Sequence, residues 1–385
     1  MNAPIKNYAE ESLAFHAKYH GKLETISKAP IVTREDLSLA YTPGVAAPCL
    51  AIEKNPEDAY IYTLKSNTVA VISDGSAVLG LGNIGPLAGL PVMEGKCVLF
   101  KEFAGINAFP IVLATQDTEE IIQTIKNIAL TFWGINLEDF SAPRCFEIEN
   151  RLKAELDIPV MHDDQHGTAI VALAGLINSL KITGKKKESV RVVINWPGAA
   201  WTAIMKLFQL WGIQDIVMCD SHGILSETRT DLSREKKELA DITNPRHISG
   251  TLKDAIVWAD VFVGVSAPNV LTRTDIQTMN SDAIIFAMAN PIPEIMPEEA
   301  RAWGARIIAT GRSDFPNQLN NVLVFPGIFK GALKYRIRMI TDEMKLAAAE
   351  ALAAYVKNPT EEMIIPNPLD KTVVDVIAES VGVFR

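Results

Sequence analysis

The second half of the chain alternates short apolar segments with amphipathic ones, and this alternation restricts the fold more than any other feature of the sequence. Apolar runs predict strands at 190–195, 215–220, 261–265, 283–289 and 305–310. Helical periodicity predicts helices at 199–210, 233–240, 251–259 and 297–303. Because parallel strands need a crossover connection, usually a helix, this order predicts a doubly wound parallel sheet of the Rossmann type. We therefore expect an α/β protein.

The chain is long enough for more than one domain. Its 385 residues exceed the usual size of a single domain. We predict an α/β N-terminal domain at 1–160, the Rossmann-like domain at 161–326, and a C-terminal helical segment at 327–385 that packs back on the N-terminal domain. Within the N-terminal domain, the pattern predicts helices at 7–28, 118–133 and 142–156 and strands at 68–73, 97–100 and 110–114.

Composition argues against several classes of partner. The formal net charge is −9 and the chain has no long basic run, so we expect neither nucleic acid nor an anionic membrane as the main partner. The longest apolar run, 169–177, is too short to span a bilayer, and the N-terminus lacks the apolar core of a signal peptide. The four cysteines are far apart and form no C-x-x-C pair, which indicates a reducing compartment. We expect a cytoplasmic protein that acts on a small molecule.

Two pairs of adjacent carboxylates suggest a metal site. A short apolar strand at 159–161 leads to Asp163 and Asp164, and we expect Thr168 to cap a small-residue helix at 169–180. Carboxylates between a strand and a helix lie where α/β proteins bind ligands. Glu138 and Asp139 form the second pair. Clustered carboxylates repel one another unless a cation neutralises them, and Mg²⁺ or Mn²⁺ is the cation that such oxygen ligands favour.

Simpler interpretations of these residues remain open. Adjacent acidic residues are often solvated turn residues, although apolar segments flank Asp163 and Asp164. His162 and His166 have the spacing of a zinc-binding pair on a helix, but Gly167 interrupts the helical pattern, so we do not predict zinc there.

A dinucleotide is expected in the doubly wound domain. The run from Gly80 to Gly85 fits G-x-G-x-x-G, but no acidic strand end follows at the usual distance, so we interpret it as an active-site loop. In the doubly wound domain, the predicted strand at 190–195 leads through a turn into a helix, and Asp220 ends the next strand 22 residues after Gly198. An acidic residue there hydrogen-bonds the adenosine ribose and favours NAD over NADP.

The turn after the first strand of that domain is unusual. It contains Trp196, Pro197, Gly198, Ala199, Ala200 and Trp201. Only the middle glycine of the usual three is present, Trp196 would resist a positive φ, and Trp201 would overpack the contact between helix and strand by about 1–3 kcal/mol. These residues predict weakened or altered cofactor binding. Alternatively, the loop has rearranged and still binds the cofactor through Gly198, Ala199, Ala200 and Asp220.

Seven ordered segments, which together extend over nearly the whole chain, resemble malic enzymes, and in particular their short bacterial form. They are Tyr-Thr-Pro-Gly-Val (41–45), Val-Leu-Gly-Leu-Gly-Asn-Ile-Gly (78–85), Gly-Lys (95–96), Leu-Glu-Asp-Phe (137–140), His-Asp-Asp-Gln-His-Gly-Thr-Ala (162–169), Ala-Asn-Pro-Ile-Pro-Glu (289–294) and Asn-Asn-Val-Leu-Val-Phe-Pro-Gly (320–327). The resemblance implies oxidative decarboxylation of malate to pyruvate and CO₂, with NAD(P)⁺ and Mg²⁺ or Mn²⁺, by a homodimer.

The resemblance also implies roles for individual residues. Lys96 would take the proton of the malate hydroxyl, Asp163 would tune Lys96, and Tyr41 would protonate the enolate left after loss of CO₂. On chemical grounds, a desolvated lysine near carboxylates can act as such a base, and a Lewis-acid metal stabilises an enolate. The metal ligands implied are Glu138, Asp139 and Asp164. The residues implied to hold substrate or nicotinamide are Asn290, Asn320 and Asn321.

One position departs from the family in the carboxylate-binding region. Larger malic enzymes have an arginine two residues before Leu79, where this chain has Ala77, so another cation must bind the malate carboxylate, and Arg312 is our candidate.

Three hypotheses follow from the sequence. The first is an NAD-dependent malic enzyme. The second is a variant with impaired NAD binding that still decarboxylates oxaloacetate with its metal, as the unusual turn suggests. The third is a non-catalytic relative that binds a dicarboxylate, against which the complete set of acid–base and metal residues argues.

Overall fold

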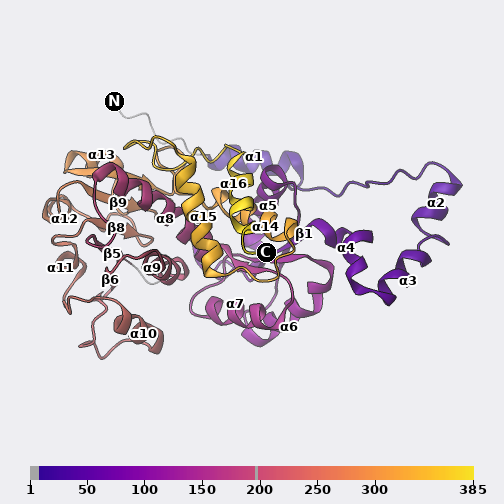
Figure 1. Ribbon diagram of the computed structural model, residues 1–385, viewed down its shortest axis with the longest axis horizontal. Helices are drawn as coiled ribbons and strands as arrows, with labels where there is room; N and C mark the ends of the chain where they lie inside the picture. The colour runs from indigo at the N-terminus through magenta and orange to yellow at the C-terminus, as the bar shows by residue number, and fades with distance from the viewer. Residues whose placement is uncertain (1–7, 196–197) are drawn as a thin grey trace.

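The computed structural model describes residues 8–195 and 198–385, which are organised around two sheets (Figure 1). The first sheet has the strand order β2-β1-β3-β4 and the second has the order β10-β9-β8-β5-β6-β7. Every pairing is parallel except that of β6 with β7. The first sheet comprises β1 (Thr68–Ser73), β2 (Asn107–Val112), β3 (Gly134–Leu137) and β4 (Val160–His162). The second comprises β5 (Arg191–Asn195), β6 (Asp215–Asp220), β7 (Gly223–Ile224), β8 (Val261–Gly264), β9 (Ala283–Ala287) and β10 (Ala305–Thr310).

Helices cover both faces of the first sheet. The helix α5 (Pro86–Leu99) packs against β1 and β2, while α6 (Thr118–Ile128) and α7 (Arg144–Glu155) pack against each other. Ile121, Ile148 and Leu152 from α6 and α7 join strand residues in one apolar core. Because both faces are covered, all six residues of β1 are buried, as expected for a central parallel strand.

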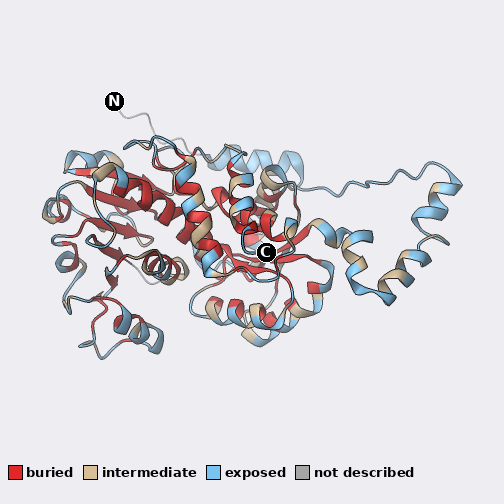
Figure 2. Ribbon diagram, viewed as in Figure 1, coloured by how far each residue is buried: buried red, intermediate tan, exposed pale blue. Residues whose placement is uncertain are grey.

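The second sheet is also covered on both faces, which confirms the predicted doubly wound α/β architecture. Its two sides carry separate apolar cores. The helices around it are α8 (Asp163–Thr183), α9 (Ala199–Trp211), α10 (Arg234–Ile242), α11 (Leu252–Ile256), α12 (Arg273–Thr278) and α13 (Pro297–Ala302). In Figure 2, the strands and much of α8 are buried. Every residue from Ala169 to Leu180 is buried, so this part of α8 is a core helix without a solvent face.

The C-terminal helices connect the two halves of the molecule. They are α14 (Phe325–Lys334), α15 (Asp342–Tyr355) and α16 (Val373–Gly382). The rings of Phe325 and Phe329 in α14 pack edge-on against Phe100, with centroids 4.8 and 5.3 Å away. Helix α15 packs on α8. These contacts agree with a segment that packs back on the N-terminal half, while the boundaries at 160 and 326 stay predictions.

The N-terminal region forms an extended arm. It contains α1 (Ala9–Tyr19), α2 (Arg34–Ala40), α3 (Ala46–Lys54) and α4 (Ala59–Tyr62). Figure 1 shows α2 and α3 standing apart from the rest of the molecule, and Figure 2 shows them largely exposed. No residue of these four helices is buried. The arm exposes large apolar side chains, among them Leu37, Leu39, Leu50, Ile61 and Tyr62.

Several predicted elements are wrong. Lys96 does not precede a strand at 97–100 but lies inside α5, where Pro86 occupies the favoured first helical position and tertiary packing outweighs the glycines within the helix. The helix predicted at 169–180 begins six residues earlier, at Asp163, with His162 rather than Thr168 at its N-cap. The helix predicted at 7–28 ends at Tyr19. The strand β3 was not predicted.

Within the described residues, no helix combines the length and the apolar character needed to cross a membrane.

Candidate active site

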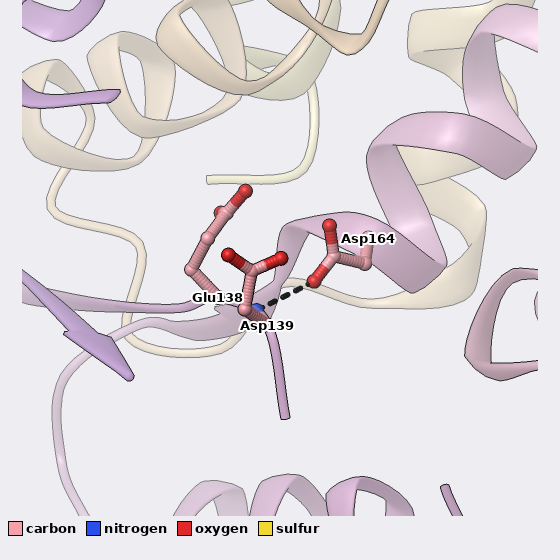
Figure 3. A group of neighbouring side chains, drawn as sticks. All are labelled: Glu138, Asp139 and Asp164. Carbon is pink, nitrogen blue, oxygen red and sulfur yellow. Dashed lines mark hydrogen bonds between the residues drawn. The ribbon is translucent and has the colours of Figure 1, made fainter. Parts of the chain in front are cut away.

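Three carboxylates meet at the carboxyl edge of the first sheet. The strands β3 and β4 are parallel neighbours, so the residues that follow them, Glu138 and Asp139 on one side and Asp164 on the other, come together. Each offers one carboxylate oxygen, and these three atoms lie within 4.8 Å of one another. Figure 3 shows the three side chains converging, with the Asp139 amide donating to Asp164 Oδ2 at 2.7 Å. Asp139 has a φ of 58°, a conformation that aspartate tolerates better than most residues.

The cluster suits a hard divalent cation. Its donors are all oxygens, which Mg²⁺ and Mn²⁺ prefer. Burial raises the pKa of Glu138 well above its ordinary value, and Asp164, Asp163 and Asp139 raise it further against the opposing effect of Lys96. A divalent cation would relieve this repulsion. Within residues 8–195 and 198–385, no other group of three histidine, cysteine or acidic side chains has such a geometry.

Lys96 projects from α5 toward the same carboxylates. Its Nζ lies 2.6 Å from Asp163 Oδ2 and 2.8 Å from Glu138 Oε1. The ammonium also lies 4.4 Å from the centroid of the Phe325 ring. Burial alone would lower the pKa of Lys96, but Asp163 and Glu138 outweigh it and raise this pKa above its usual range. Lys96 is therefore a buried ammonium in this arrangement.

Asp163 links Lys96 to the C-terminal half of the chain. Asn321 Nδ2 donates to Asp163 Oδ2 at 2.6 Å, so one carboxylate oxygen contacts both Lys96 and Asn321. Asn320 has a different local role, because its Oδ1 accepts from the Val322 amide and caps a short 3₁₀ turn. Asn290 is exposed and precedes Pro291 after the end of β9. The structure thus brings Asn321, but not Asn320 or Asn290, into contact with the Lys96 cluster.

Tyr41 and Arg312 lie outside this cluster. Tyr41 follows α2 on the arm, its side chain is 66% exposed, and Figure 1 shows α2 far from α5, which carries Lys96. Arg312 Nε lies 2.8 Å from Asp314 Oδ1, and Arg312 Nη1 donates to the Pro291 carbonyl at 2.7 Å, which places Arg312 near Asn290. Neither residue contacts Lys96 in the described structure.

The helix that should face a dinucleotide begins at the unusual turn. Gly198 is the N-cap of α9, and a Cβ added to it would meet no atom within 4 Å. Ala199 and Ala200 form the first helical positions. Trp201 is 2% exposed and belongs to the main core, so the bulky ring is accommodated, but its Nε1 has no hydrogen-bond partner among the described residues. Trp196 and Pro197 lie outside the described residues.

Asp220 ends β6 as predicted, but its carboxylate already has partners. Arg229 binds both oxygens, at 2.7 and 3.2 Å, Lys236 Nζ lies 2.6 Å from Oδ2, and the His222 amide donates to Oδ1 at 2.9 Å. The Asp220 side chain is fully buried. The sequence did not predict the contacts with Arg229 and Lys236, which arrive from the following loop and from α10.

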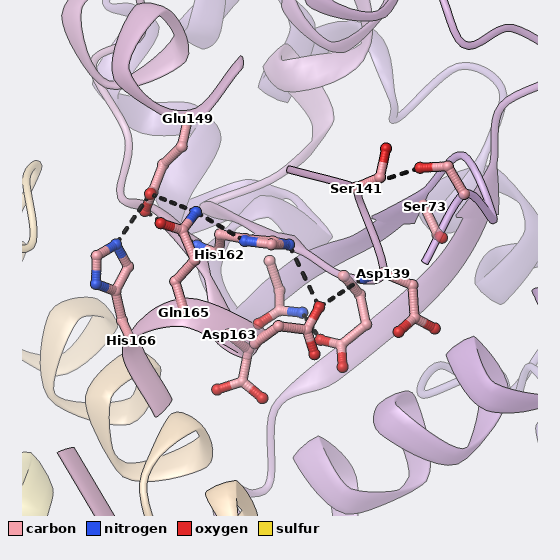
Figure 4. Close-up of polar contacts among 12 residues, drawn as sticks. Ser73, Asp139, Ser141, Glu149, His162, Asp163, Gln165 and His166 are labelled. Atoms are coloured by element: carbon pink, nitrogen blue, oxygen red, sulfur yellow. Dashed lines mark hydrogen bonds and ion pairs between the residues drawn. The ribbon is translucent and has the colours of Figure 1, made fainter. Parts of the chain in front are cut away.

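Glu149 is a further residue that the sequence did not mark, and it contacts both of the histidines considered above. Glu149 lies in the helix predicted at 142–156, is 3% exposed and contacts His166 (Figure 4). It also contacts Lys153. Its spacing from Cys145 and Leu152 on the buried face was the available signal. His162 and His166 do not form a metal-binding pair with each other. Instead, both lie close to Glu149.

An oxygen-ligand cluster and a buried lysine, next to a doubly wound parallel sheet, define an α/β enzyme with a dinucleotide-type domain. The family models for malic enzymes match both halves. The N-terminal domain model matches residues 20–153, and the NAD binding domain model matches residues 165–381. The chain therefore belongs to the malic enzyme family.

Known relatives agree with this assignment over almost the whole chain. The bifunctional malic/malolactic enzyme of Bacillus subtilis is 56% identical over 376 residues, which cover 97% of this chain and 92% of that protein. The NAD-dependent malic enzyme of Geobacillus stearothermophilus is 56% identical, over 98% of this chain and 79% of the relative. The crystal structure of the NAD-dependent malic enzyme from Thermotoga maritima is 50% identical and superimposes with a TM-score of 0.94 over 96% of this chain and 98% of that one.

Proposed function

We propose that this protein oxidises malate with NAD⁺ and a divalent cation and releases pyruvate and CO₂. The observation that carries the proposal is the convergence of Glu138, Asp139 and Asp164 within 4.8 Å, beside the buried Lys96. Malic enzymes similar to this chain include NAD-dependent ones, which supports NAD as the coenzyme. When bound, the cation would polarise the substrate oxygen at C2 and stabilise the enolate that decarboxylation leaves.

The proposed role of Lys96 is to take the hydroxyl proton of malate while a hydride passes from C2 to the nicotinamide. The raised pKa of Lys96 keeps it protonated beside Asp163 and Glu138. An ammonium cannot accept a proton, so we propose that Lys96 becomes the base only when the cation neutralises part of the carboxylate charge around it. Asp163, held by Asn321, then keeps Lys96 in place through the 2.6 Å contact.

We propose that Tyr41 protonates the enolate carbon in the active site of a second copy of the chain. Tyr41 sits on an exposed arm that stands away from Lys96 of its own chain (Figure 1). The same arm exposes Leu37, Leu39 and Leu50, and apolar side chains gathered in this way indicate a protein interface. A symmetric homodimer would cover these side chains twice and complete both sites.

A second candidate function is decarboxylation of oxaloacetate without NAD. The sequence of the turn before α9 favours it, because the turn keeps only one of the three glycines that usually bring the backbone and helix close to the pyrophosphate. Oxaloacetate already carries the keto group, so this reaction needs the cation and an enolate-protonating group but no hydride acceptor.

The test follows both reactions in one preparation. Purified protein with malate and Mn²⁺ is assayed for NADH over a wide range of NAD⁺, with NADP⁺ in parallel, and oxaloacetate loss is measured without nucleotide. We expect NADH formation that falls by about 10²–10⁴-fold in Lys96→Ala and is abolished in Asp164→Asn. Glu155→Gln, which changes an exposed carboxylate of α7, is the control and should behave as wild type.

Oxaloacetate loss without malate oxidation would favour the second candidate over the first. Activity that survives in Asp164→Asn would contradict the proposed metal site.

A further inference from the structure

The Asp164 carboxylate is contacted from two sides. The Asp139 amide donates to its Oδ2, and His162 Nε2 lies 3.3 Å from the same oxygen. His162 is completely buried at the end of β4, where it is also the N-cap of α8. The 3.3 Å contact is close but is not aligned as a full hydrogen bond, and it favours this orientation of the carboxylate when Nε2 carries the hydrogen.

The protonation of the imidazole can be traced through a chain of buried groups (Figure 4). Gln165 Nε2 lies 3.3 Å from Glu149 Oε2 and 2.8 Å from His162 Nδ1. An ionised carboxylate only accepts hydrogen bonds, so the Gln165 group that faces Glu149 must be its NH₂. One hydrogen of this group points to Glu149 and the other to His162. His162 Nδ1 is therefore the acceptor, and the hydrogen resides on Nε2, toward Asp164.

Glu149 is itself held from several directions. It is 3% exposed, accepts from the His162 amide at 3.1 Å, and lies 2.9 Å from His166 Nε2 and 2.6 Å from Lys153 Nζ. These contacts join α7 to the start of α8 and keep the carboxylate paired, as a buried charge requires. Glu149, which sets the donor-to-acceptor direction of these hydrogen bonds, is thus held in place by the fold.

We propose that Glu149, through Gln165, locks His162 in the tautomer whose Nε2 hydrogen faces Asp164, and that His162 is a positioning residue for this metal ligand. The inference rests on the metal site proposed above. Ligand carboxylates and histidines in metal sites depend on such outer partners, whose loss weakens metal binding about 10–100-fold. His162 does not touch substrate or cation in this scheme.

The test measures Mn²⁺ binding rather than turnover. The dissociation constant is obtained from the electron paramagnetic resonance of free Mn²⁺, and the melting temperature is recorded for each variant. We expect His162→Leu to raise the Mn²⁺ dissociation constant about 10–100-fold and His162→Gln, whose amide can still donate to Asp164, to recover most of the affinity. Gln165→Leu should weaken binding in the same direction. The ¹⁵N-histidine spectrum should show His162 protonated at Nε2.

Asn178→Leu is the matched control. Asn178 is a buried polar residue of the same helix α8, and it donates to the carbonyls of Ala353 and Ile364, away from the carboxylates. The substitution Asn178→Leu should lower the melting temperature without changing the Mn²⁺ dissociation constant.

The outcomes separate this inference from the metal site itself. No Mn²⁺ binding by the wild type, or binding unchanged in Asp164→Asn, would refute the metal site. The positioning role is tested when the wild type binds Mn²⁺ and Asp164→Asn does not. In that case, wild-type affinity in His162→Leu would overturn the positioning role. Failure of His162→Gln to recover affinity would overturn it as well. If His162→Leu does not fold, Gln165→Leu decides the question, and unchanged affinity there overturns the proposal.

Discussion

Asp220 illustrates how the partners of one side chain decide its role. It stands where an acidic residue would meet the ribose, but its oxygens are bound by Arg229, Lys236 and the His222 amide. Burial by itself would raise the pKa of Asp220, yet these partners lower it below its ordinary value. We infer that Asp220 first organises the loop after β6, and contacts the ribose only if one of these partners yields.

Replacing Asp220 with asparagine should therefore affect stability more than coenzyme affinity. Removing the Asp220 charge leaves its buried cationic partners uncompensated. We therefore expect the free energy of unfolding, measured in urea, to fall by about 3 kcal/mol. Because the folded pKa lies below the unfolded value of about 3.9, the contribution of the ionised group is present above that pH and lost as the pH falls below it. The variant should thus lose less stability than wild type on acidification below pH 4.

Asp231→Asn is the control for this experiment. Asp231 also binds Arg229 but is half exposed, so its loss should cost less than about 1 kcal/mol. A tenfold or larger rise in the NAD⁺ dissociation constant of Asp220→Asn, without a loss of stability, would contradict our interpretation.

Among the secondary-structure elements, α8 does most to assemble the candidate active site. It begins at Asp163, directly after β4, so that Asp163 and Asp164 lie in its first turn beside the carboxylates that follow β3. Gly167 is part of this arrangement rather than an interruption of the helix. A Cβ on Gly167 would overlap Asp163 Oδ1 and press on the Asn321 side chain. Only glycine leaves room for the Asp163 side chain that binds Lys96.

Gly167→Ala should displace Asp163 and thereby disturb Lys96. We expect a loss of stability of about 1–3 kcal/mol from overpacking and a decrease in kcat of roughly 100-fold from the misplaced side chains. The measurements are urea unfolding and NADH formation.

Gly95→Ala is the matched control for this substitution. Gly95 also lies within a helix and precedes Lys96, but a Cβ there would meet only Lys22 Nζ, at 3.5 Å. The free energy of unfolding of Gly95→Ala should rise by up to about 1 kcal/mol from helix propensity, and the variant should keep its activity. Equal effects of the two substitutions would contradict the steric explanation.

On the scale of the whole molecule, the arm is the feature that a single chain does not explain. Its helices contribute no buried residue, while Leu39, Leu50 and Tyr41 are each more than 60% exposed. The rest of the chain, by contrast, has continuous apolar cores on both faces of each sheet. A second copy that receives the arm would resolve this contrast and bring a tyrosine to Lys96.

Mixing two inactive variants tests this arrangement. Tyr41→Phe and Lys96→Ala should each have strongly reduced activity as homodimers. If Tyr41 acts in the partner's site, a mixed dimer contains one site with both residues intact, so an equimolar, exchanged mixture should recover about a quarter of wild-type activity. Sedimentation should show a dimer that Leu50→Glu dissociates.

No recovery in a mixture shown to contain mixed dimers would mean that Tyr41 serves its own chain. A monomeric wild-type protein would refute the proposal that Tyr41 acts in the site of a second copy.

The sequence alone determined those features that depend on local patterns. The alternation of strands and helices predicted the parallel sheet, since side-chain periodicity reports which faces are covered. The position of Asp163 and Asp164 after a strand predicted where a ligand site would form, and seven segments identified the resemblance to malic enzymes. The sequence did not predict the start of α8, the strand β3 or the helix around Lys96, because the glycines and prolines in these segments have low helix and strand propensities.

Only the tertiary structure decided which groups touch and with what consequence. Lys96 and Asp163 are 67 residues apart, and Asp163 and Asn321 are 158 apart, yet each pair is joined at 2.6 Å. The contact of the buried Glu149 carboxylate with His166, which lies 17 residues further along the chain, arises in the same way. The interaction energy of a charged group depends on its distance from other charges and on the exclusion of water. Both are set by packing between distant segments rather than by neighbours in the chain.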